Sequence, residues 1–287
     1  NGHMLQASLR AYLLAVGKDN LVAWVDRNVT FPCSMVDRIT PRTTEELQAE
    51  IASQFPKLSA SPIHSEDYIQ WVLEDRFAGR MADLTKVGVE VVADVDPYEE
   101  AKIRILNGGH TGLAYLGALA GHNTFDEAMR DPEIRPHFDN LESEEVLPGL
   151  QLALPFDKDV YCERIAERFA NQAIADALER ICMDGFTKFP IFVRPTLEGC
   201  LAQGISPQYC YASIASWYVF ARRHARAQGR IDYHEPNWHL LAPMLEDGAE
   251  NDFATSVVLW GDLPSAYVDF VPGIVSAIEE MDNRWPV

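Results

Sequence analysis

The chain has 287 residues, 47% of them hydrophobic, which is enough to bury a substantial core in one large or two ordinary domains. Its formal net charge of −19 comes from scattered acidic residues, which argues against nucleic acid or an acidic membrane as partner and favours a small molecule. No apolar run approaches the ~18 residues of a membrane span, and the first residues lack the basic-then-apolar layout of a signal peptide, so we expect neither membrane insertion nor secretion. The five cysteines are never spaced C-x-x-C, so we expect reduced, mostly structural thiols in a cytoplasmic protein.

The first third of the chain has the sequence pattern of a mixed α/β region. Thr43 with Glu46 offers a capping box for the third of its helices, and runs of β-branched and aromatic residues predict its strands. Helices are expected over about residues 4–16, 21–27 and 43–51, and strands over 69–73 and 87–92.

After Pro97 nearly every segment has helical periodicity, and no further strand is predicted. The change at about Asp96 therefore marks the expected boundary between a mixed part, residues 1–96, and an all-α part, residues 97–287. Helices are expected over about residues 98–119, 125–130, 141–146, 158–171, 173–182, 207–227, 236–245, 254–259 and 267–281.

The helix predicted after Pro97 carries an amine, an amide and an imidazole: Lys102, Asn107 and His110. At ~100° per residue these three and Glu99 fall within an arc of about 140°, so they can line one cleft. A primary amine serves as general base only if its pKa falls from about 10.4 toward the working pH, and burial among apolar neighbours lowers it. The pattern is suited to moving a proton without a metal.

Two oxidoreductase patterns contain Lys102. Tyr98-x-x-x-Lys102 matches the acid/base pair of short-chain dehydrogenases, but those enzymes need a glycine-rich nucleotide loop near the start of the fold. Here the only similar string, residues 111–117, follows the pair on the same predicted helix. We therefore set this interpretation aside.

The second pattern, Lys102-x-x-x-x-Asn107-x-x-His110, resembles the K-x-x-x-x-N-x-x-H signature of the long-chain polyol dehydrogenases, the mannitol dehydrogenase and hexuronate reductase family. Further stretches resemble that family in the same order along the chain. They are residues 31–41 (FPCSMVDRITP), 70–75 (QWVLED), 107–117 (NGGHTGLAYLG) and 184–190 (DGFTKFP).

The resemblance implies roles for the signature residues. Lys102 would be the general acid/base, Asn107 would form part of an oxyanion hole, and His110 would position the substrate hydroxyl. Chemistry supports each role, because oxidising a secondary alcohol needs a base for the hydroxyl proton, and an amide donor stabilises the developing alkoxide.

Other site residues are implied by their positions in the matching motifs. Arg180 and Lys188 correspond to family residues that hold substrate hydroxyls, and Asp37 corresponds to a polar residue at the pocket. Glu99 would carry the proton to solvent, or would be a carboxylate favoured by the helix dipole. An arginine on an amphipathic helix is also commonly a solvated ion pair.

The sequence departs from the family pattern in one large respect, because no G-x-G-x-x-G follows a predicted strand. We expect residues 1–96 to be the carboxy-terminal portion of a Rossmann-type nucleotide-binding domain, with the glycine-rich part upstream. The second oxyanion asparagine would lie there too, which leaves Asn1 a weak candidate. Cys33 stands where the family has a polar asparagine.

The sequence thus predicts a metal-free oxidoreductase that uses NAD or NADP to interconvert a polyol, such as mannitol or arabinitol, and its ketose. The resemblance favours a monomer. The alternative is a non-catalytic helical module for binding or assembly, derived from such a dehydrogenase. Zinc-dependent alcohol oxidation ranks third, since the His and Cys residues lack ligand spacing.

Overall fold

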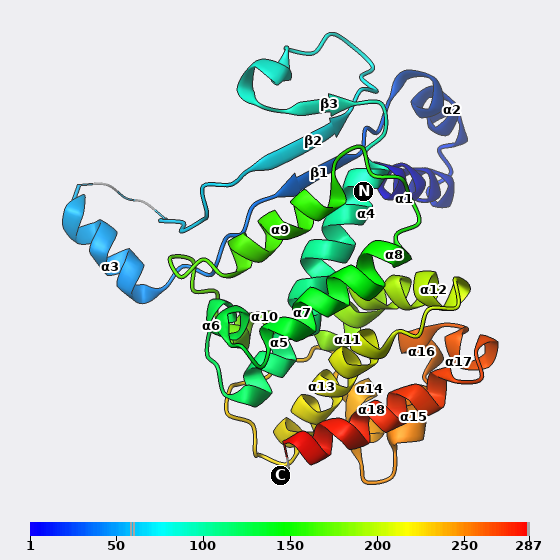
Figure 1. Ribbon diagram of the computed structural model, residues 1–287. Helices are drawn as coiled ribbons and strands as arrows, with labels where there is room; N and C mark the ends of the chain where they lie inside the picture. The colour runs from blue at the N-terminus through cyan, green and yellow to red at the C-terminus, as the bar shows by residue number, and fades with distance from the viewer. Residues whose placement is uncertain (58, 60, 286–287) are drawn as a thin grey trace. The chain divides into compact units, whose positions relative to one another are not determined.

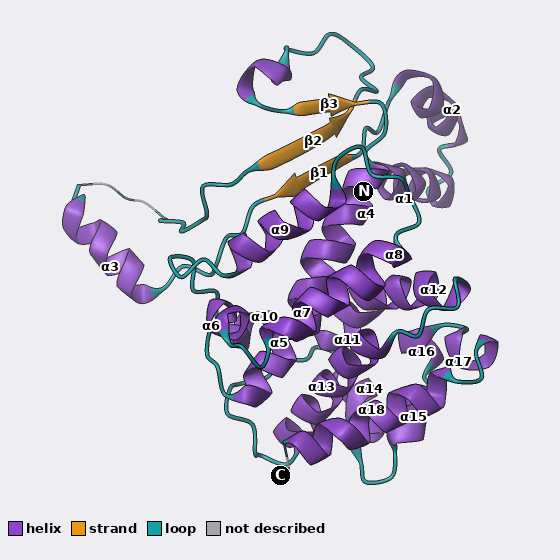
Figure 2. Ribbon diagram, in the orientation of Figure 1, coloured by secondary structure: helices purple, strands orange, loops and turns teal. Residues whose placement is uncertain are grey.

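The computed structural model describes residues 1–57, 59 and 61–285. The chain divides into two compact units, each built from two stretches of sequence. Unit 1 comprises Asn1–Thr40 and Ile63–Glu100, and unit 2 comprises Pro41–Pro62 and Ala101–Val287. Figure 1 shows the elements in chain order, and Figure 2 shows that the strands drawn all belong to unit 1.

Unit 1 is built on a small mixed sheet with strand order β1-β2-β3, formed by β1 (Ser34–Asp37), β2 (Gln70–Glu74) and β3 (Glu90–Val92). β1 runs antiparallel to β2, with Val36 opposite Trp71, and β2 runs parallel to β3. Met35 is buried whereas Val36 and Trp71 are exposed, so one face of the sheet packs and the other leaves apolar side chains uncovered.

The helices of unit 1 pack into small apolar clusters. α1 (Gly2–Ala15) packs against α2 (Asp19–Asn28), with Leu13 and Val25 in their shared cluster. The 3₁₀-helix η1 (Leu84–Val87) precedes β3, and α4 begins at Asp96 and runs to Ala101.

Three details of the first part differ from prediction. β1 was not predicted, because four residues that include Ser34 and Asp37 give no β-branched run. β3 starts at Glu90 because the preceding residues form η1. Helix α3 (Glu45–Gln54) is capped one residue later than expected, by Thr44, whose side chain accepts the Leu47 N–H at 3.2 Å.

The regular secondary structure of unit 2 is mainly helical among its described residues. Besides α3 it contains a π-helix η2 (Lys102–Gly108), α5 (Gly109–Ala120), α6 (Phe125–Arg130), α7 (Arg135–Asn140), a π-helix η3 (Leu141–Val146), α8 (Leu147–Gly149), α9 (Lys158–Phe169), α10 (Leu178–Ile181), α11 (Gly185–Lys188), a π-helix η4 (Phe189–Val193), α12 (Arg194–Ala202), α13 (Gln208–Ala225), α14 (Trp238–Leu241), a 3₁₀-helix η5 (Ala242–Leu245), α15 (Glu250–Ala254), α16 (Val257–Trp260), α17 (Leu263–Ala266) and α18 (Phe270–Arg284).

Helix α13 is the centre of unit 2, where it packs against both α5 and α18 (Figure 1). Its Trp217 and Tyr218 are fully buried, and the side chain of Glu145 accepts the backbone N–H groups of Tyr209 and Cys210 at 2.6 and 2.8 Å. Those groups belong to the first turn of the helix and have no partner within it. A carboxylate from η3 therefore fixes where α13 begins.

Two helices of the second part were predicted too long. Residues 176–178 instead pair with residues 123–125 around an antiparallel bridge between Thr124 and Ala177. Just before them, Ala175 has a φ of +43°, which is not a helical conformation. Only α10 remains of the helix expected over 173–182. The helix expected over 254–259 is interrupted between α15 and α16.

The predicted order of a mixed α/β part followed by a mainly helical part is confirmed. Most predicted helices are present, and α6 has the bounds that its sequence predicted. No helix in the described ranges has the length and apolar character needed to cross a membrane.

Glycines let the first helices of unit 2 pack closely. A Cβ on Gly109 would collide with the Glu142 carboxyl group and lie 2.8 Å from the Phe138 ring. A Cβ on Gly112 would lie 2.9 Å from Leu141 and 3.0 Å from Ser213. Backbone at these positions therefore sits directly against η3 and α13, where no side chain larger than hydrogen fits.

We predict that Gly109→Ala lowers the free energy of unfolding by about 1–3 kcal/mol, the usual cost of overpacking a filled interior. Gly79→Ala is the matched control, because a Cβ there meets nothing within 4 Å. Urea unfolding of both variants checks the prediction. Equal midpoints for Gly109→Ala and the parent protein would contradict it.

Candidate active site

The signature residues lie on one continuous helical path whose middle turn is not an α-helix. α4 ends at Ala101, η2 follows from Lys102 to Gly108, and α5 begins at Gly109. Lys102 and Asn107 are both in η2, and His110 is the second residue of α5. All three side chains are half-buried.

The π-helical turn changes which residues share a face. A regular α-helix would place Lys102 and Asn107 about 140° apart around its axis. In a π-helix each hydrogen bond joins residues five positions apart, so such residues lie nearly above one another. The regular α-helix expected over residues 102–108 is therefore replaced by a π-helix, whose wider turn favours Lys102 and Asn107 on the same side.

His110 is held between aromatic rings. Its imidazole stacks on Phe169 at 4.9 Å and meets the edge of Phe125 at 4.3 Å between ring centroids. Burial lowers the pKa of His110 well below its usual value, and the positive charges of Arg180 and Lys188 lower it further. The imidazole is therefore neutral near pH 7, with one nitrogen able to donate and the other to accept.

The Arg180 side chain is held by the carboxylate of Asp176, a residue that lies outside the predicted site. Its Nε donates to Oδ1 of Asp176 at 2.8 Å, and its Nη2 pairs with the other carboxylate oxygen. Asp176 is only 5% exposed, whereas the Arg180 side chain is 39% exposed. The i, i+4 spacing of the two residues was the sequence signal that could have revealed this pair.

Lys188 ends the short helix α11, and its Nζ donates to the carbonyl oxygen of Ile181 at 2.7 Å. Burial lowers the pKa of Lys188 below its usual value. Contacts connect these residues: His110 packs on Phe125, whose N–H donates to the carbonyl of Asp176, the residue that holds Arg180. Lys188 binds the carbonyl of Ile181, the neighbour of Arg180 in sequence.

The remaining predicted residues belong to unit 1. Asp37 ends β1 and is 2% exposed, and Glu99 lies half-buried in the first turn of α4. The Asn1 side chain pairs with the backbone of Ser34, accepting its N–H at 3.1 Å and donating to its carbonyl. The proposed site roles of Asp37, Glu99 and Asn1 stay predictions.

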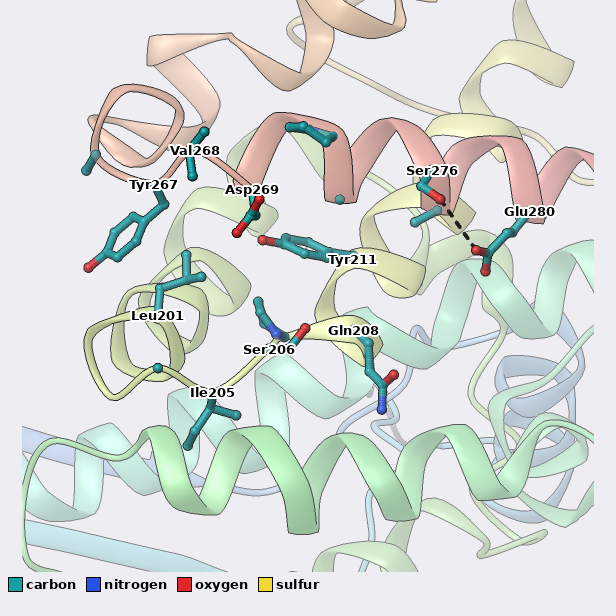
Figure 3. A pocket seen from close by; sticks show the side chains of 16 residues that line it. Leu201, Ile205, Ser206, Gln208, Tyr211, Tyr267, Val268, Asp269, Ser276 and Glu280 are labelled. Atoms are coloured by element: carbon teal, nitrogen blue, oxygen red, sulfur yellow. Dashed lines mark hydrogen bonds between the residues drawn. The ribbon is translucent and has the colours of Figure 1, made fainter.

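A cavity of about 800 Å³ lies elsewhere in unit 2, between the start of α13 and α18 (Figure 3). Its charged lining residues are Asp269 and Glu280, and the Ser276 hydroxyl donates to Glu280 at 3.5 Å. No predicted site residue lines it. Within the described ranges, no group of three or more His, Cys, Asp or Glu side chains is arranged to hold a metal ion.

Comparison with known proteins agrees with the signature. The profile of the mannitol dehydrogenase C-terminal domain matches residues 94–282, and that of the mannitol dehydrogenase Rossmann domain matches residues 1–86. The chain belongs to the mannitol dehydrogenase family. The resemblance drawn from the motifs is thereby confirmed.

Relatives within the mannitol dehydrogenase family share much of this chain. It is 43% identical to the D-arabinitol 4-dehydrogenase of Ralstonia nicotianae over 208 residues, 72% of this chain and 44% of the relative. It is 33% identical to the D-mannonate oxidoreductase of Escherichia coli over 293 residues, 99% of this chain and 59% of the relative.

A solved structure of the family has the same fold. The ternary complex of Pseudomonas fluorescens mannitol 2-dehydrogenase with NAD and D-mannitol matches 99% of this chain and 58% of its own, with 31% identity and a TM-score of 0.87. The chain spans about half the length of the curated relatives it matches.

The depressed pKa of His110 predicts a specific pH dependence of stability. The unfolded chain binds a proton at this imidazole near pH 6.5 and the folded chain does not, so stability is lost as the pH falls below about 6.5. His110→Phe keeps an aromatic ring and removes this proton. We predict a smaller loss of unfolding free energy between pH 7.5 and pH 5.5 in the variant.

Urea unfolding at pH 7.5, 6.5 and 5.5 measures this difference directly. Parallel pH profiles for the parent protein and His110→Phe would show that His110 takes up its proton equally in both states.

Proposed function

We propose that the protein of which this chain forms part is an NAD(P)-dependent oxidoreductase that interconverts a polyol and its ketose without a metal. Mannitol with fructose and arabinitol with xylulose are the leading substrate pairs. The observation that supports this function is the π-helical turn Lys102–Gly108, whose pitch favours the amine of Lys102 and the amide of Asn107 on one side of a helix leading to His110.

We assign no cofactor contact to the residues that the structure describes. β2 and β3 are its parallel pair, and a loop with the 3₁₀-helix η1 joins them in place of a glycine-rich turn into an α-helix. These residues do not form a pyrophosphate cradle. A nicotinamide cofactor, when bound, supplies the hydride acceptor or donor.

This chain's own side chains handle the proton and the oxygen. Lys102 takes the proton of the reacting hydroxyl during oxidation and returns it during ketose reduction. Asn107 donates its side-chain N–H to the oxygen as negative charge develops there, which stabilises the transition state by a few kcal/mol. A metal ion is not needed for either task.

His110 and the two cations orient the open-chain substrate. The neutral imidazole can donate to one substrate oxygen or accept from a hydroxyl, because one of its nitrogens carries a hydrogen and the other a lone pair. Arg180 and Lys188 offer N–H donors to further hydroxyls from positions fixed by Asp176 and by the carbonyl of Ile181. Asp37 and Glu99 are proposed as pocket and proton-path residues of the same site.

We predict that Lys102→Ala, in the full-length protein, lowers kcat by about 10²–10⁴-fold while the thermal midpoint changes little, because a general base is lost. Steady-state oxidation of NADH and NADPH with fructose, xylulose and fructuronate measures this. Added methylamine should restore part of the activity by supplying a free amine in the vacated space.

Lys86→Ala is the matched control, since its side chain is 79% exposed, and its kcat should equal that of the parent protein. Near-normal kcat in Lys102→Ala would exclude the proposed base. A folded full-length protein that turns over none of the ketoses would favour the non-catalytic binding module instead.

A further inference from the structure

Hydrogen bonds hold the segment that carries Lys188 to a loop that is distant in sequence. The backbone N–H of Asp184 donates to the carbonyl of His234 at 3.0 Å, and that of Phe186 donates to Oε2 of Glu235 at 3.0 Å. Both donors lie at the start of α11, whose last residue is Lys188. The loop of residues 228–237 thus determines where this helix begins.

Glu235 is the centre of these contacts. Its Oε2 also accepts the hydroxyl of Tyr233 at 2.7 Å, and its Oε1 accepts the backbone N–H of Asn237 at 3.1 Å. The residue is 7% exposed, and all its neighbours in these bonds are donors, as suits a carboxylate, which only accepts. Its side chain caps α11 from 49 residues away in sequence.

The start of α11 has no cap of its own. Asp184 occupies the N-cap position with a φ of +57°, and its side chain makes no capping hydrogen bond. A carboxylate at a helix start satisfies a free backbone N–H and complements the helix dipole. Glu235 supplies both effects in place of Asp184.

The loop is itself anchored to the core of unit 2. Trp217 of α13 is fully buried and donates its Nε1–H to the hydroxyl of Tyr233 at 2.9 Å. A Cβ on Gly185 would collide with Nε1 of the Trp217 ring and lie 2.7 Å from the Tyr115 hydroxyl, so α11 starts directly against these two side chains. The chain of contacts runs from the core through Tyr233 and Glu235 to the helix that ends at Lys188.

We propose that Glu235 is a positioning residue for Lys188, and through it for the polyol or ketose hydroxyl that Lys188 binds. This rests on the proposed function, because Lys188 is there assigned to the substrate. Glu235 touches no substrate itself. It sets the direction in which the half-buried side chain of Lys188 can reach.

Glu235→Gln tests the proposal in the full-length protein. The glutamine amide keeps one acceptor oxygen, but its NH₂ group replaces the other and cannot accept a hydrogen bond. Whichever way the amide turns, at least one of the hydrogen bonds that Glu235 accepts is lost. We expect kcat/KM for the active ketose to fall about tenfold or more, chiefly through a higher KM. Glu246→Gln, which makes the same charge change at an exposed residue, should leave kcat/KM within about twofold.

A double-mutant cycle with Lys188→Met separates positioning from general structural support. If Glu235 acts through Lys188, the double variant has the kcat/KM of Lys188→Met alone. Losses that multiply in the double variant would overturn the proposal, as would a Glu235→Gln enzyme with parental kcat/KM. Thermal unfolding of each variant confirms that folded proteins are compared, and Glu235→Asp serves if the glutamine variant does not fold.

Amide hydrogen exchange distinguishes failure of this proposal from failure of the proposed function. Glu235→Gln should speed exchange at Phe186 by about tenfold or more, whether or not a ketose is turned over. Unchanged exchange at Phe186 would overturn the positioning role. Absence of turnover in the parent protein, with faster exchange in the variant, would remove only the assignment of Lys188 to a polyol.

Discussion

The close approach of three π-helical turns, with glycine between them, is the constraint on which the site depends. A Cβ on Gly108 of η2 would lie 3.1 Å from the carbonyl oxygen of Phe192 in η4, and Gly109 leaves no room beside Glu142 of η3. A cavity of about 10 Å³ lies where the three turns meet, beside Gly108, Leu141 and Val193. Backbone packing of this kind favours the wide turn of η2, and the pitch of that turn favours Lys102 and Asn107 on one side of the helix.

Buried carboxylates hold the surrounding helices by capping them from other parts of the sequence. Glu145 caps α13, and Glu235 caps α11. Each satisfies backbone donors that would otherwise be unpaired at a helix start. Asp176 does the equivalent for a side chain by holding Arg180. The cations near His110 are thus held by groups outside the signature, and burial together with their positive charge lowers the pKa of the imidazole.

Much of the fold was predictable because helices longer than two turns show their apolar periodicity, as α9 and α13 do. Short elements were not, because local contacts do not decide them. β1 exists through its pairing with β2, and residues 176–178 leave the helical conformation to pair with 123–125. The π-helical turn of η2 is likewise invisible to periodicity, since packing against η3 and η4 selects it.

The motifs identified the residues proposed for catalysis and substrate binding, but not the residues that hold them in place. The motifs named His110, Arg180 and Lys188, which lie close enough for both cations to depress the pKa of the imidazole. Asp176 could have been found from its spacing to Arg180, but Glu235 is remote in sequence from the residues it holds. Contacts made only in the folded chain leave no local pattern.

The most direct test of the central claim is a crystal structure of the full-length protein with a nicotinamide cofactor and a polyol bound. If the π-helical turn builds the site, Lys102 Nζ and the Asn107 side-chain nitrogen will both lie within about 3.2 Å of the same substrate oxygen. A structure in which residues 102–108 form a regular α-helix, or in which the two side chains contact different substrate oxygens, would contradict it.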